Sequence, residues 1–170
     1  MTWIMIGLLA LAVYLDVRER RIPNWLVLAG VATALVWHLY QGGFSGLVFS
    51  LKGLGLGLLL LMLPFAMGGM GAGDVKLLGM VGAFKGAVFV FNAFLWMALI
   101  GGLIALAVLI REQRLGEFLV RIGRGMILAL TGGRAKLLLT SASTEPFSVS
   151  FPYAAAIAMG AVAALFRGWC

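Results

Sequence analysis

The sequence has few charged residues and only one cysteine. Charged residues make up 11% of its 170 positions, whereas a soluble domain carries roughly a quarter. Hydrophobic residues make up 63% of the chain and the mean hydropathy is +1.09, so most of the surface is expected to face lipid. The lone Cys170 can form neither an internal disulfide nor a cysteine-rich metal site. The composition excludes an ordinary soluble enzyme and predicts an all-α, polytopic membrane protein.

The excess of basic over acidic residues gives a net charge of +7, which could indicate binding to nucleic acid. The basic residues are instead spread over short loops between apolar runs, where they orient a membrane protein. One orientation puts most of them on the cytoplasmic side and leaves both termini outside. Membrane lipids, and not nucleic acid, are therefore the predicted partners of the basic surface.

Six apolar runs are close in length to the roughly 20 residues that a helix needs to cross a bilayer. The boundary between the fourth and fifth is open, because Lys85–Gly86 could mark the turn. We expect one domain over residues 1–170, a bundle of about six transmembrane helices with a glycine-rich break before the fourth. The runs cover about residues 2–17, 24–40, 46–66, 75–91, 92–110 and 149–166.

Residues 111–149 form the one long segment between the predicted spans. Apolar residues recur within it at helical spacing and arginines fall between them. This pattern is typical of a helix that lies on an anionic membrane surface. We expect a cytoplasmic loop that contains such an interfacial helix.

Only six residues are acidic, and two of them occupy unusual positions, Asp16 and Asp74. Asp16 ends a first run that is too short to clear the hydrocarbon core, so its carboxylate is expected at membrane depth near the inner face. A charge at that depth is costly unless it faces the protein interior or a water-filled cavity. The remaining four acids lie in basic or polar loops, where solvation explains them: Glu19, Glu112, Glu117 and Glu145.

Asp74 follows a glycine-rich stretch, residues 68–73, where the chain is expected to return to the inner face that carries Asp16. Gly71 and Gly73 lack side-chain bulk and would let a substrate strand or a neighbouring helix approach the acid. Asp74 is also expected to cap a helix that begins at Val75.

Two acids on one membrane face suggest a catalytic pair. Carboxylates that share a site favour a single shared proton. The ionised member can then take a proton from water while the other polarises a scissile carbonyl, so neither a metal nor a cofactor is predicted. Each acid also has a simpler interpretation, a helix cap for Asp74 and an interfacial ion pair for Asp16. A small proton- or cation-coupled transporter and a non-catalytic scaffold of a pilus or secretion complex are the alternative functions.

Two sequence strings favour the protease. GAGDVKLLG at residues 71–79 and DVRERRIPN at residues 16–24 together resemble the type IV prepilin peptidase family, within the Gly-x-Gly-Asp membrane aspartyl proteases. FPYAAAIAMG at residues 151–160 is similar to the last span of that family. The resemblance implies that Asp16 and Asp74 are the catalytic residues.

The resemblance also implies a substrate and a location. The enzyme would remove the short basic leader of type IV prepilins or pseudopilins at the cytoplasmic face of a prokaryotic inner membrane. Lys76 could bind substrate, pair with an acid or simply mark the cytoplasmic side. The residues expected to bind or position the substrate are Gly71, Gly73, Lys76, Pro23 and Asn24.

The chain departs from the longer bacterial members of the family. Those members carry an amino-terminal cytosolic region with paired cysteines and also methylate the new amino terminus. Here the first apolar run begins at Thr2, and no Cys-x-x-Cys pair occurs. The chain therefore resembles the short, peptidase-only form of tight-adherence (Flp) pilus systems, and methyltransferase activity is not expected. Archaeal preflagellin peptidases have a similar layout, so both origins stay open.

Overall fold

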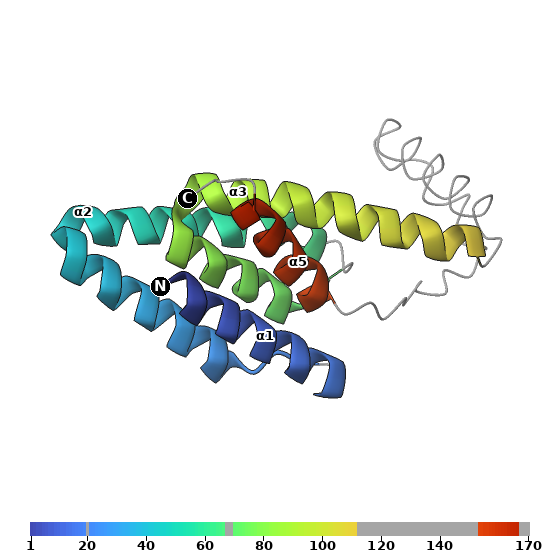
Figure 1. Ribbon diagram of the computed structural model, residues 1–170, viewed down its shortest axis with the longest axis horizontal. Helices are drawn as coiled ribbons and strands as arrows, with labels where there is room; N and C mark the ends of the chain where they lie inside the picture. Colours follow the sequence, from blue (N-terminus) through green and yellow to red (C-terminus); the bar gives the residue numbers. More distant parts are fainter. Residues whose placement is uncertain (20, 67–69, 112–152, 167–170) are drawn as a thin grey trace, which may run out of the picture. The chain divides into compact units, whose positions relative to one another are not determined.

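The computed structural model describes residues 1–19, 21–66, 70–111 and 153–166. This part of the chain forms four helices, which confirms the predicted all-α class. The predicted interfacial helix falls within residues 112–152, outside the described residues. The helices are α1 (Thr2–Glu19), α2 (Asn24–Ala66), α3 (Ala72–Arg111) and α5 (Tyr153–Phe166), and Figure 1 shows their order along the chain.

The chain divides into two compact units, and the first contains both Asp16 and Asp74. That unit comprises residues 1–101 and 152–170, so it contains α1, α2, α5 and most of α3. By length and composition, α2 and the part of α3 from Ala72 to Ile104 are apolar enough to cross a membrane. The described residues therefore agree with a membrane protein.

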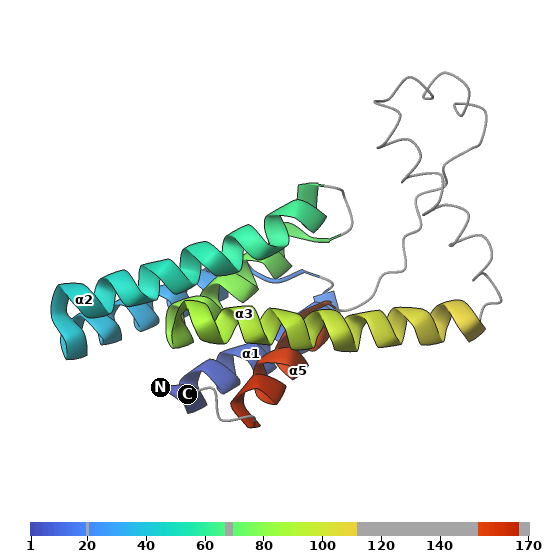
Figure 2. The ribbon, with the colours of Figure 1, turned by 90° about the horizontal axis from the view of Figure 1, so that it is seen from above.

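Both long helices are broken once, at a glycine. A straight helix of 43 residues would extend about 65 Å, twice the thickness of a hydrocarbon core. Gly43 (φ 56°) in α2 and Gly86 (φ 83°) in α3 leave the helical conformation, and glycine adopts such positive φ values without steric cost. Each helix folds back on itself at its break, as Figures 1 and 2 show. We call the two parts of each helix its first and second arms.

The break at Gly86 decides a predicted boundary that the sequence left open. Lys85–Gly86 could mark the turn between the fourth and fifth apolar runs or lie inside a fourth run that ends at Phe91, and the structure places the break at Gly86. Asn92 stays inside the second arm of α3 because its amide donates a hydrogen bond of 2.9 Å to the Val88 carbonyl one turn earlier. Its polarity is satisfied within the helix, so no turn is needed there.

The first arm of α3 is the central element of the unit. It is buried on nearly all sides, which is unusual for a helix and requires neighbours all round. The second arm of α2 packs closely along it through small residues: a Cβ added at Gly53 would collide with the Gly82 backbone, and one at Gly57 would crowd Leu78 and Gly79. Such contacts let membrane helices approach backbone to backbone. The buried apolar residues of the first arm of α3 are Val75, Leu77, Leu78, Met80, Val81, Ala83 and Phe84.

Two carbonyl groups just before the Gly86 break have side-chain partners on α2. They belong to Ala83 and Phe84, three and two residues before the break. The Ser50 hydroxyl donates a hydrogen bond of 2.7 Å to Ala83 O, and His38 Nε2 lies 3.1 Å from Phe84 O. In lipid an unsatisfied carbonyl would cost several kcal/mol. These two side chains therefore stabilise the break and fix the depth of the first arm, whose other end carries Asp74.

Candidate active site

Four chain segments meet at one end of the first unit. They are the end of α1, the start of α2, the start of α3 and the start of α5. A Cβ added at Gly73 would touch Ile22 at 3.0 Å, so the α1–α2 connection lies against the start of α3. α1 and α5 run side by side in opposite directions (Figures 1 and 2). We call this region the acidic end, because it contains both Asp16 and Asp74.

Asp74 lies at the start of the buried arm of α3. It is only 7% exposed, and its Oδ2 accepts a hydrogen bond of 3.3 Å from the Gly71 backbone N–H. The predicted cap is thus wrong in its position: the helix begins at Ala72 and not at Val75. Asp74 is the third helical residue and reaches back to the N–H that precedes the helix, as the acid of a capping box does.

Asp16 lies on the buried face of α1. Met5, Leu9 and Ala12 are almost fully buried, and Asp16 continues their spacing of three and four residues, which marks one side of a helix. Its carboxylate therefore points into the protein and not toward lipid. It accepts a hydrogen bond from the backbone N–H of Ala154, at the start of α5.

The structure brings the two acids together. Asp16 and Asp74 lie close enough for their charges to interact, although more than fifty residues of α2 and its connections separate them in the sequence. Each carboxylate also accepts a hydrogen bond from one backbone N–H. The donor is Gly71 for Asp74 and Ala154 for Asp16. Two carboxylates whose charges interact in this way influence each other's ionisation, as the members of a catalytic pair do.

The five predicted positioning residues also lie at this end. Lys76 Nζ donates a hydrogen bond of 2.9 Å to Asn24 Oδ1 on the exposed surface, so the possible pairing of Lys76 with an acid is not what the structure contains. The Pro23 carbonyl accepts the Leu26 N–H at 3.2 Å and starts α2. Gly71 and Gly73 contact Asp74 and Ile22 as described above.

One residue of the site was not predicted. Ala154 contributes only its backbone N–H, which every residue except proline possesses, so no pattern of residue types could single it out. The available signal was indirect: the start of the last apolar run had to approach the acids for a backbone contact to form.

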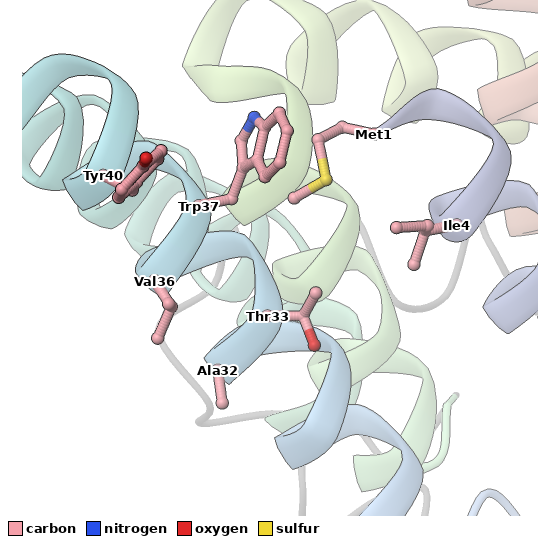
Figure 3. A pocket seen from close by; sticks show the side chains of 7 residues that line it. All are labelled: Met1, Ile4, Ala32, Thr33, Val36, Trp37 and Tyr40. Atoms are coloured by element: carbon pink, nitrogen blue, oxygen red, sulfur yellow. The ribbon is translucent and has the colours of Figure 1, made fainter.

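A surface pocket of about 500 Å³ lies elsewhere in the unit (Figure 3). It is lined by Met1, by Ile4 of α1 and, on α2, by Ala32, Thr33, Val36, Trp37 and Tyr40. Ile4 and Asp16 are twelve positions apart on one helix, about 18 Å along its axis. The pocket is therefore separate from the acidic end. Among the described residues no three His, Cys, Asp or Glu side chains cluster as metal ligands would.

The chain matches the sequence model of one known family. The sequence model of the type IV leader peptidase family matches residues 3–106, which include both acids and all five predicted positioning residues. Neither the curated proteins nor the solved structures gave a match.

Proposed function

The chain belongs to the type IV leader peptidase family, and on that basis we propose that it is a membrane-embedded aspartic endopeptidase whose catalytic pair is Asp16 and Asp74. Membership of the family implies a peptidase that acts on prepilin-type substrates. The finer proposal is that the enzyme removes the short basic leader of type IV prepilins or pseudopilins, without methylating the product. In this proposal residues 1–170 form one transmembrane peptidase domain.

The observation that carries the proposal is the proximity of two acids that the sequence separates widely. In the proposed reaction the ionised carboxylate takes a proton from a water molecule, whose oxygen attacks the carbonyl carbon of the scissile bond. The protonated carboxyl donates its proton to the carbonyl oxygen. When the tetrahedral intermediate collapses, the C–N bond breaks and the departing nitrogen receives a proton from the pair.

We propose that the acidic end faces the cytoplasm of a prokaryotic cell and that both termini lie outside. Folding back at Gly43 and Gly86 gives α2 and α3 two arms each, so with α1 and α5 six helical segments would traverse the inner membrane. The exposed basic residues Arg18, Arg21 and Lys76 lie at the acidic end, and positive charge is retained on the cytoplasmic side. That is also where the leader of a substrate would meet the bilayer.

We propose that the exposed Lys76–Asn24 pair positions the substrate backbone beside the acids, on the surface shaped by Pro23, Gly71 and Gly73. Lys76→Met is expected to lower kcat/KM for leader removal about tenfold, since a hydrogen bond to a charged group contributes about 1.5–3 kcal/mol. Stability should change little, because the pair is exposed. Lys52→Met, which removes an exposed lysine from the middle of α2, is the control and should keep normal kinetics. Equal kinetics for the two variants would remove Lys76 from the site.

The proposed function is tested by incubating the purified protein in lipid vesicles with an intact prepilin and sequencing the product. We expect a single cut just before the hydrophobic segment of the substrate, with an unmodified new amino terminus. A transporter or a scaffold would leave the prepilin intact. An uncut prepilin, in vesicles where a known leader peptidase cuts it, would therefore refute the proposal.

A further inference from the structure

Asp16 accepts a hydrogen bond from α5, a helix that carries neither of the two acids. The donor is the backbone N–H of Ala154, in the first turn of α5 (Tyr153–Phe166). The first four N–H groups of a helix have no acceptor within that helix. In an apolar environment such a group needs a partner, and the Asp16 carboxylate supplies it. The contact therefore gives an N–H at the start of α5 an acceptor and gives the Asp16 carboxylate a donor.

α5 is held firmly enough to fix this N–H in space. It packs along α1, and one face of it is buried over its whole length: Ala154, Ala156, Ile157, Gly160, Ala161 and Ala164. A Cβ added at Gly160 would collide with the Ala93 carbonyl and with Met97 on the second arm of α3. The helix can neither rotate nor slide without losing this close approach, so Ala154, whose exposure is 0%, stays beside Asp16.

We propose that the backbone N–H of Ala154 is a positioning group, which holds the Asp16 carboxylate in the orientation that faces Asp74. This inference rests on the proposed function of the acid pair. Ala154 does not touch the substrate. It occupies one side of the Asp16 carboxylate, as the Gly71 N–H occupies one side of Asp74.

The test replaces one backbone N–H by an ester oxygen. The protein is synthesised in a cell-free system with lipid vesicles, and the α-hydroxy counterpart of alanine is incorporated at position 154. The matched control carries the same replacement at position 155, whose N–H also lies in the first turn of α5. We expect the ester at 154 to lower kcat for leader removal about tenfold to a hundredfold, with KM within about twofold of the unmodified protein. The ester at 155 should leave both constants unchanged.

A second measurement separates positioning from a general weakening of α5. The esters at 154 and 155 should melt at similar temperatures, since each lacks one N–H of the same helical turn, so a lower kcat at 154 alone reports the contact with Asp16. Equal kcat values for the esters at 154 and 155, whether normal or reduced, would overturn the positioning role, because a general weakening of α5 would then explain the result. Failure of the unmodified protein to cut prepilin would instead refute the proposed function itself.

Discussion

Asp74→Asn is expected to reduce leader removal by at least about 10³-fold, the range in which positioned acids and bases contribute to catalysis. Asparagine keeps the size of the side chain and can still accept the 3.3 Å hydrogen bond from the Gly71 N–H, so the start of α3 should stay intact. It can neither ionise nor carry the proton that the pair shares. The rate is measured with purified variant in vesicles, by following the appearance of the shortened prepilin.

Asp16→Asn should cause a loss of similar size, and the double variant should be little worse than either single one, since the two acids act as a unit. Glu19→Gln is the control. Glu19 is one turn beyond Asp16 and is exposed, so its variant removes one negative charge from the same end of α1 and should cut at the normal rate. Leader removal by either asparagine variant at more than a tenth of the normal rate would exclude the two-carboxylate mechanism.

The two acids were predictable because charge is rare in this chain and costly at their depth. Asp16 and Asp74 interrupt apolar runs, and the structure does bring them together. The spacing of Met5, Leu9 and Ala12 could also have been used to predict that Asp16 points inward, since it continues their helical face. The residue types in a sequence are therefore enough to identify side chains that are unfavourable in lipid.

Other features depend on backbone groups and on partners distant in sequence, which residue type does not reveal. The boundary between the fourth and fifth apolar runs was left open, and the structure keeps Asn92 inside a helix with a hydrogen bond to Val88 O. Asp74 was expected to start a helix, yet its carboxylate reaches back to Gly71 and the helix begins earlier. Ala154 takes part only through its N–H. In each case the interaction joins a side chain to a main-chain group.

Gly53→Ala is expected to destabilise the protein by about 1–3 kcal/mol, the usual cost of overpacking, and to reduce leader removal with it. The added Cβ would collide with the carbonyl of Gly82 and come within 2.8 Å of Gly86 Cα. These are backbone atoms, so no side-chain rotation can relieve the collision and the second arm of α2 has to move away from α3. The melting temperature in detergent should fall by at least about 3 °C.

Gly55→Ala is the matched control, because Gly55 lies on the same arm of α2 and a Cβ there meets nothing within 4 Å. Both substitutions gain the same helix propensity, up to about 1 kcal/mol, so any difference between them reports the contact with α3 alone. Gly55→Ala should therefore melt no lower than the unmodified protein. The buried arm of α3 carries Asp74 at its start, and its depth is set along the same contact by the Ser50 hydrogen bond to Ala83 O. Separation of the two arms should thus displace Asp74 relative to Asp16. If Gly53→Ala melts as Gly55→Ala does, the close approach of these arms does not hold the acid in place.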